Sequence, residues 1–161
     1  MVDVVNELIA SASRLRDASQ SIARRIVSEG VADLVYNPLN YAWDVHEEFI
    51  RRTGGNGAKC ILLGMNPGPH GMGQMGIPFA ATSVVRDLIR ITGITVAIPE
   101  ITHPRRPVNG LEHPKEEVSG TRLWGVLEHR YGDIDKISKE VYVVNHCPLT
   151  ILNGDRGTNV T

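Results

Sequence analysis

Apolar residues along this chain follow two patterns, helical stripes and short continuous runs. In the first 28 residues they recur at steps of three and four, at Val5, Ile9, Ala12, Leu15, Ile22 and Ile26. This spacing predicts one long amino-terminal helix over residues 2–29, which Asp3 can cap and Gly30 can end. The same periodicity predicts helices over 43–52, 82–92 and 120–131, and a short helical or turn segment over 136–140.

Two continuous apolar runs, 60–63 and 141–144, have the length of strands and predict buried ones. Each run leads into a proline-containing turn that carries an asparagine, Asn66 after the first and Asn145 after the second. In a parallel sheet both amides would project from the same edge. Open α/β sheets place their binding sites at that carboxyl edge, so we expect a functional site there.

The alternation of helices with apolar strands predicts an α/β protein with three layers, α/β/α, around a short central parallel sheet. The chain has 161 residues, 42% of them hydrophobic, which suits a single domain over residues 1–161 with a real core. We see no apolar stretch near the roughly 20 residues of a membrane span, and expect no membrane partner.

Charge and cysteine content narrow the class further. The formal net charge is −1, so nucleic-acid binding would need a local basic patch. Arg105 and Arg106, braced by prolines in the segment 103–107, suit phosphate contacts, although an ordinary exposed basic loop explains them equally well. Cys60 and Cys147 lie in apolar runs and predict two reduced, buried thiols, which fits a cytoplasmic or nucleoid setting.

The glycine-rich run after Asn66 contains a formal dinucleotide-binding pattern, with glycines at positions 71, 73 and 76. That pattern functions between a strand and an opening helix, whereas Ile77-Pro78 follows the third glycine here. A nucleotide-binding α/β protein is therefore disfavoured. The six histidines show no metal-ligand spacing, so we expect neither a metal nor another cofactor.

The segment 64–79 resembles the first active-site motif of the single-strand-selective monofunctional uracil-DNA glycosylases, a branch of the uracil-DNA glycosylase superfamily. The matching residues are Gly64-Met65-Asn66-Pro67-Gly68-Pro69, Gly71-Met72, Gln74 and Gly76-Ile77-Pro78-Phe79. Later segments match in the same order: Asn37-Pro38-Leu39 with Tyr41-Ala42-Trp43, His103-Pro104 with Arg106-Pro107-Val108, Glu117-Val118-Ser119-Gly120, Trp124-Gly125, and Asn145-His146-Cys147-Pro148-Leu149.

The resemblance implies a DNA repair glycosylase of the uracil-DNA glycosylase fold, with a role for each matching position. Asn66 would position the attacking water, Asn145 would read the base edge, and Phe79 would stack on the flipped base. Met65, Gly68 and Met72 would line the base pocket, the last two near C5 of the base. Pro67, Arg105, Arg106 and Ser119 would contact DNA; Ser119 begins a predicted helix whose amino end can receive a phosphate.

The resemblance also sets an expectation about extent. In the family a histidine that stabilises the departing base, and a wedge, lie in a later His-Pro-Ser-Pro loop, which this sequence does not contain. We therefore expect the first part of a longer enzyme, with carboxyl-terminal strands missing. Two functions stay open: a monofunctional glycosylase, acting as a monomer on uracil in single- or double-stranded DNA, in the cytoplasm or a nucleus; or a non-catalytic nucleic-acid binding module.

Overall fold

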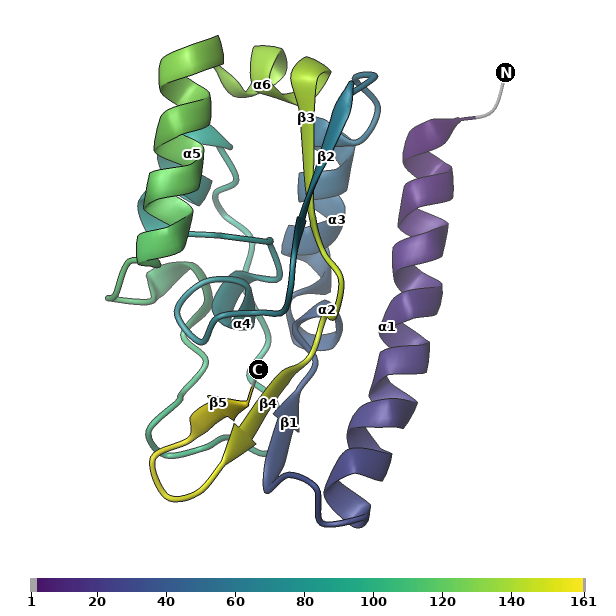
Figure 1. Cartoon of the computed structure of the whole chain (residues 1–161), viewed down its shortest axis with the longest axis vertical. Helices are drawn as coiled ribbons and strands as arrows, with labels where there is room; N and C mark the ends of the chain where they lie inside the picture. The colour runs from purple at the N-terminus through teal and green to yellow at the C-terminus, as the bar shows by residue number, and fades with distance from the viewer. Residues whose placement is uncertain (1–2, 161) are drawn as a thin grey trace.

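The first helix spans almost the length that the sequence predicts. The computed structural model describes residues 3–160 (Figure 1). In it α1 runs over Val4–Ser28, and the Asp3 carboxylate accepts a hydrogen bond from the Asn6 N–H. This side-chain cap satisfies one of the unpaired donors of the first turn. Val2, which the predicted helix includes, lies outside the described residues.

The remaining elements alternate helices with short strands. In chain order they are β1 (Leu34–Tyr36), α2 (Pro38–Tyr41), α3 (Trp43–Thr53), β2 (Cys60–Gly64), α4 (Met72–Met75), η1 (Val84–Leu88), η2 (Gly110–Glu112), α5 (Val118–Tyr131), α6 (Ile134–Glu140), β3 (Val141–Asn145), β4 (Thr150–Asn153) and β5 (Thr158–Val160). The helices predicted near 43–52, 120–131 and 136–140 are present as α3, α5 and α6.

The strands form two small sheets. β2 and β3 pair in parallel with Cys60 opposite Val141 and Gly64 opposite Asn145, so the predicted α/β class and the parallel pairing are confirmed. A second, antiparallel sheet in the order β1-β4-β5 was not predicted. Its strands have three or four residues, too few for a clear alternation of apolar and polar positions.

Helices lie on both sides of the parallel pair. Figure 1 shows β2 and β3 between α5 and α1, with α3 close by. The main core joins α3, α5, α6 and β3: the Phe49 ring stacks on Tyr142 and meets the Trp124 ring edge-on, at centroid distances of 6.2 and 6.4 Å. Burial of such large aromatic side chains supplies much of the stabilisation of a small domain.

The expectation of a fully buried strand at 60–63 is wrong. β2 forms as predicted, but Ile61 and Leu63 are each 65% exposed. The cause is the sheet itself: within residues 3–160, β2 pairs with β3 alone, and only the face that carries Leu62 packs on the main core. Cys60, at the start of the strand, is exposed and Cys147 is half-buried, so the prediction of two buried thiols is also wrong.

The predicted helix over 82–92 is shorter and less regular than expected. Thr82 and Ser83 are helical, and the chain then forms a π-helical turn, η1, in which the Ile89 N–H donates to the Val84 carbonyl. Arg90 follows with a left-handed φ of 63°. Ile89 and Ile91 stay buried despite this break. The two isoleucines are apolar because tertiary packing buries them, and their spacing therefore resembled the continuation of a helix.

No helix among residues 3–160 has both the length and the apolar character required to cross a membrane.

Candidate active site at the ends of two parallel strands

The chain segments that follow β2 and β3 remain paired beyond the strands. The His146 N–H donates to the Gly64 carbonyl at 2.8 Å, and the Cys147 N–H donates to the Met65 carbonyl at 2.9 Å. Asn145 thus ends β3 directly opposite Gly64, the last residue of β2, and Asn66 lies in the loop two residues after Gly64. The predicted convergence of the two asparagines at one sheet edge is confirmed.

Asn145 is the most constrained polar side chain at this edge. It is only 7% exposed, and its Nδ2 lies 3.1 Å from Sδ of the buried Met72. Its Oδ1 is buried without a hydrogen-bond partner in the described structure. A buried, unpaired acceptor costs about 1–3 kcal/mol, so a ligand that donates a hydrogen bond to this oxygen would be favoured.

Phe79 forms a wall beside this amide. Its ring lies against Gly64, where an added Cβ would fall 2.6 Å from the ring and would also collide with Asn145 Oδ1. Its carbonyl lies against Gly120, which likewise leaves no room for a side chain. Phe79 adopts a φ of 53°, a conformation that is costly for a bulky residue and occurs where the surroundings enforce it. Two glycines therefore fix the ring next to the unpaired amide.

Asn66 lies in a different environment. It is half-buried, and its side chain makes no hydrogen bond to any group within residues 3–160. The backbone around it is held firmly: the Pro67 carbonyl accepts from Asn159 Nδ2 at 3.1 Å, and the Gly68 carbonyl accepts from the Gly73 N–H at 3.0 Å. A rigid loop thus presents a free amide.

A carboxylate lies against the loop that follows Asn66. An added Cβ at Gly68 would fall 2.5 Å from Glu117 Oε2, and one at Gly71 would fall 3.0 Å from the same oxygen. Burial raises the pKa of the Glu117 carboxyl, while Ser119 opposes that rise. The expectation that Gly68 lies near C5 of the base stays a prediction, and the group that lies against Gly68 in the structure is this carboxylate.

Two histidines join the same loop to the segment around η2. Nδ1 of His70 lies 3.0 Å from Nε2 of His113, and the two rings stack. Burial lowers the pKa of both imidazoles, and the positive charge of Lys115 lowers both further. The pair therefore favours the neutral state, in which one ring donates and the other accepts.

The other predicted site residues have varied surroundings. The side chain of Met65 is 69% exposed, whereas Met72 is buried at 3%. Arg105 is exposed, but the Arg106 guanidinium donates through Nε to the Gly157 carbonyl at 2.9 Å and is partly buried. Ser119 is exposed in the first turn of α5, next to the Glu117 carboxylate.

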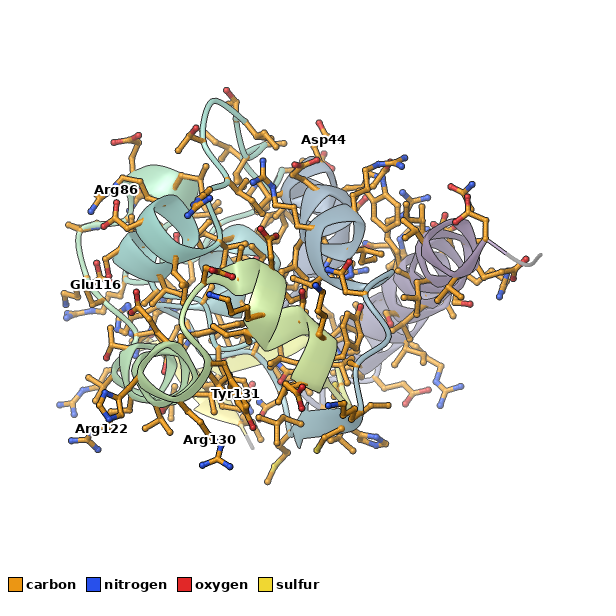
Figure 2. All side chains as sticks on the ribbon, turned by 90° about the horizontal axis from the view of Figure 1, so that it is seen from above. Asp44, Arg86, Glu116, Arg122, Arg130 and Tyr131 are labelled. Atoms are coloured by element: carbon orange, nitrogen blue, oxygen red, sulfur yellow. The ribbon has the colours of Figure 1, made fainter. Side chains whose placement is uncertain are left out.

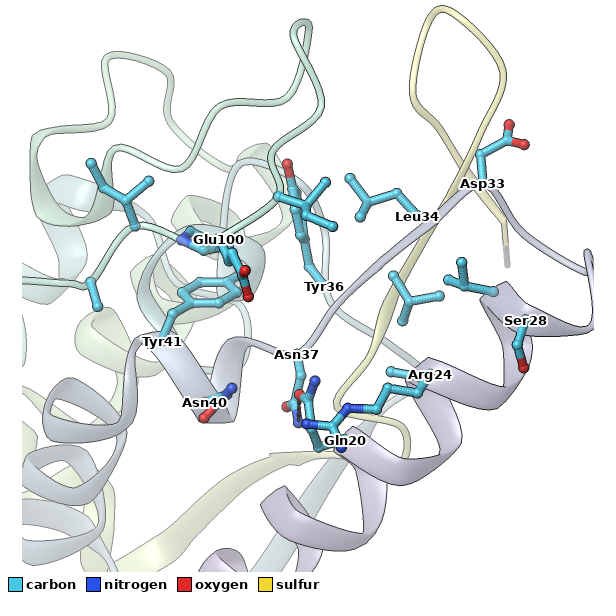
Figure 3. A pocket seen from close by; sticks show the side chains of 17 residues that line it. Gln20, Arg24, Ser28, Asp33, Leu34, Tyr36, Asn37, Asn40, Tyr41 and Glu100 are labelled. Carbon is cyan, nitrogen blue, oxygen red and sulfur yellow. Dashed lines mark hydrogen bonds between the residues drawn. The ribbon is translucent and has the colours of Figure 1, made fainter.

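A larger cavity lies away from this edge of the sheet. It has a volume of about 670 Å³ and lies between α1, β1 and the segment 97–101, with Gln20, Arg24 and Tyr41 among its walls (Figure 3). A smaller, largely apolar cavity of about 190 Å³ reaches Asn145, Met72 and Pro78 from the side of α1. Among residues 3–160, no group of three or more His, Cys, Asp or Glu is placed to hold a metal ion.

Charge is dispersed over the outer surface. Figure 2 shows acidic and basic side chains interspersed around the molecule, with Arg122 and Arg130 of α5 extending away from the body. Several exposed arginines are already paired, as in Arg86 with Asp87 at 2.8 Å. A nucleic-acid contact would therefore be local to the site rather than spread over one face.

Sequence reasoning missed two features of this site. Glu117 appeared in a matching segment without a role, because only the fold brings it to Gly68 and Gly71. The His70–His113 pair joins residues 43 positions apart, and each histidine alone looked like an ordinary loop residue. The one available signal was that each histidine stands next to a proline, which restricts the backbone on that side.

Fold and site together define an α/β protein with two amides and one aromatic ring at the carboxyl edge of a parallel strand pair. No family model matches the chain. Curated relatives do. A single-strand selective monofunctional uracil DNA glycosylase of Bos taurus is 41% identical over 138 residues, covering 86% of this chain and 50% of its own length. Its counterpart in Rattus norvegicus is 42% identical over 128 residues, covering 80% of this chain and 45% of its own.

The Mus musculus protein of the same name is 41% identical over 128 residues, again covering 80% of this chain and 45% of its own. A crystal structure of wild-type Pedobacter heparinus SMUG2 covers 78% of this chain and 48% of its own, with 18% identity and a TM-score of 0.49. The resemblance to the single-strand-selective monofunctional uracil-DNA glycosylases is thereby confirmed: this chain is their homologue over four fifths of its residues or more. The chain spans about half the length of the curated relatives it matches.

Proposed function

We propose that this protein acts in DNA repair as a monofunctional uracil-DNA glycosylase, which hydrolyses the bond between uracil and deoxyribose and leaves an abasic site. The observation that carries this proposal is the buried, unpaired Oδ1 of Asn145 beside the Phe79 ring. A flipped uracil supplies both missing partners, a hydrogen-bond donor for the amide and a flat face for the ring. The names of the relatives support the same reaction.

Base selection would rest on Asn145. A side-chain amide offers one acceptor and two donors, which complement the N3–H donor and the O4 acceptor of uracil. Cytosine presents the reverse pattern and would leave buried polar groups unpaired, a mismatch that discriminates strongly. Stacking of the base on Phe79 would add about 1–3 kcal/mol. Met72, in contact with the Asn145 amide, would close the pocket, together with Met65 and Gly68.

Asn66 would position the attacking water. An amide is a poor proton acceptor, so Asn66 would contribute by orienting the water rather than by deprotonating it. Orientation is enough when the sugar becomes strongly cationic before water adds, because a cationic sugar reacts with water without a strong base. Its free side chain and rigid backbone support that role. No lysine lies in either turn, which suits hydrolysis by water rather than through a Schiff base. We also propose that 5-substituted uracils and deaminated purines are candidate substrates.

The partner would be uracil-containing DNA, single- or double-stranded, bound by a monomer. Exposed Arg105 and Ser119 are the proposed phosphate contacts. Pro67, which is buried in the free protein, is also proposed to line the path of the strand. Arg106 would contribute its charge while its guanidinium braces the 103–107 segment on Gly157. A DNA substrate would place the activity in the bacterial nucleoid, or in the nucleus of a eukaryote.

The test is a glycosylase assay on a uracil-containing oligonucleotide, with alkaline cleavage of abasic sites, comparing the natural chain with Asn66→Ala. We expect cleavage by the natural chain and its loss in the variant. Binding of the same oligonucleotide, followed by fluorescence anisotropy, runs in parallel. Specific binding without cleavage in the natural chain would overturn the enzymatic proposal in favour of a binding module.

A further inference from the structure

We propose that Glu117 is a positioning residue of this site, whose side chain holds the 68–71 loop and thereby fixes Asn66. The catalytic consequence rests on the proposed function, whereas the contact itself rests on geometry. Glu117 is the N-cap residue of α5 and lies 51 positions from Asn66 in the sequence, yet its carboxylate reaches the loop directly after it.

Two glycines of the loop are shaped around this carboxylate. At Gly68 an added Cβ would meet Glu117 Oε2 at 2.5 Å. At Gly71 it would meet the Ala80 carbonyl oxygen at 2.7 Å, and Cγ and Oε2 of Glu117 at 3.0 Å. Any side chain at either position would displace the carboxylate or move the loop. Since the Gly71 and Gly73 N–H groups both donate to the Gly68 carbonyl, a shift at Gly68 would disturb the whole turn.

The electrostatics argue against an incidental surface carboxylate. Glu117 is half-buried and has no ion-pair partner within residues 3–160, whereas the similarly half-buried Glu47 and Glu140 pair with an arginine and a lysine. Burial raises the pKa of its carboxyl. A negative group at a loop that would approach DNA phosphates weakens binding, so a packing role is needed to account for it.

The same turn also supports the aromatic wall. Three residues after Glu117, Gly120 packs on the Phe79 carbonyl, and the Thr121 N–H donates to the Glu117 carbonyl at 2.9 Å. The start of α5 thus contacts both the loop that carries Asn66 and the backbone that carries the Phe79 ring. Displacement of Glu117 would alter the distance between these two groups without unfolding the helix.

Hydrogen exchange tests the contact without relying on activity. We expect the amides of Gly71 and Gly73 to exchange faster in Glu117→Ala, by about fivefold or more, because the loop opens more often. Glu117→Gln keeps the shape of the side chain and should restore protection. The matched control is Glu116→Ala: Glu116 is the adjacent carboxylate and accepts from the Ser83 N–H at 3.0 Å, away from the loop.

A double-variant comparison sharpens the test. Gly68→Ala should speed exchange in the natural background because its methyl group meets the carboxylate. Added to Glu117→Ala, the same change should have little further effect, since the obstructing group is gone. Unchanged Gly71 and Gly73 exchange in Glu117→Ala, or additive effects of the two changes, would overturn the inference.

Kinetics separate this inference from the proposed function. On a uracil oligonucleotide, Glu117→Ala should lower kcat with KM little changed, and Glu117→Gln should recover most of the loss, as expected for a group that orients Asn66. A natural chain with no glycosylase activity would refute the proposed function while the exchange results still decide the contact. Faster exchange combined with an unchanged kcat would refute the catalytic part of the inference.

Discussion

Asn145 ends one of two adjacent parallel strands and Asn66 lies just beyond the end of the other, yet the two residues differ in nearly every physical respect. Asn145 is buried, contacts Met72, and keeps an unpaired oxygen, whereas Asn66 is half-buried with a side chain that bonds to nothing in the described structure. A fixed, buried amide is suited to recognition, because a mismatched partner leaves a buried group unpaired. A free amide on a rigid loop is suited to orienting a water molecule. The difference assigns distinct tasks to two identical residues.

The largest expected effect is at Asn66. Asn66→Ala should lower glycosylase activity by about 100-fold or more, because water is no longer oriented toward the sugar. Thermal stability should stay unchanged, since the side chain makes no hydrogen bond within residues 3–160. The measurements are a single-turnover rate and a melting curve. A large loss of stability would show that Asn66 has a structural role and that the contrast with Asn145 is mistaken.

Gly64 tests how tightly the recognition side is packed. A Cβ there would collide with Asn145 Oδ1 and with the Phe79 ring, so Gly64→Ala should lower the free energy of unfolding by about 1–3 kcal/mol. It should also abolish binding of a uracil oligonucleotide.

The matched control for this change is Gly125→Ala. Gly125 lies in α5 facing open space, and its replacement should stabilise the helix by about 0.5–1 kcal/mol. Chemical denaturation distinguishes the two. Equal effects of the two changes would contradict the packing of Phe79 and Asn145 around Gly64.

Asn145→Leu should separate binding from stability. Replacing the amide by an apolar group of similar size removes the unpaired acceptor, so the free protein should gain about 1 kcal/mol in its free energy of unfolding. Uracil binding should be lost at the same time. Denaturation in the absence of DNA and anisotropy with a uracil oligonucleotide measure the two effects. A destabilised free protein would show that Asn145 supports the fold rather than awaiting a ligand.

The smallest expected effect is on the pH dependence of stability, through His70 in the loop after Asn66 and its partner His113. The pKa values of His70 and His113 lie below the usual 6.5, so below pH 6.5 the unfolded chain binds more protons than the folded one. Stability should therefore fall as the pH drops through this window and level off below the folded pKa values. Arg106 and Lys115 repel the added charge, and Glu116 attracts it at His113.

Melting temperatures at pH 7.5 and pH 5.5 test this linkage. Between pH 7.5 and pH 5.5, the melting temperature of a variant with both His70→Gln and His113→Gln should fall by about 2 °C less than that of the natural chain. Part of the decrease should remain, because burial also lowers the pKa of His46. An identical pH dependence in the variant would show that the histidine pair is not linked to folding.

Long, periodic segments were predictable and short or edge segments were not. α1 and α5 each show an apolar spacing sustained over several turns, which only a helix satisfies. The apolar run of β2 predicts a strand correctly but says nothing about which neighbours cover it, and Ile61 and Leu63 are exposed. Similarly, Ile89 and Ile91 are buried in an irregular segment after η1, where apolar spacing alone could not reveal the π-helical turn.

The sequence by itself determined the α/β class, the two apolar strands and the turn chemistry that places an asparagine after each, because these depend on local periodicity and on the restrictions of proline and glycine. Only the tertiary structure decided which asparagine is buried, that Gly64 and Gly120 seat Phe79, and that Glu117 meets the Asn66 loop. Those features depend on contacts between segments far apart in the chain, and local patterns carry no information about such contacts.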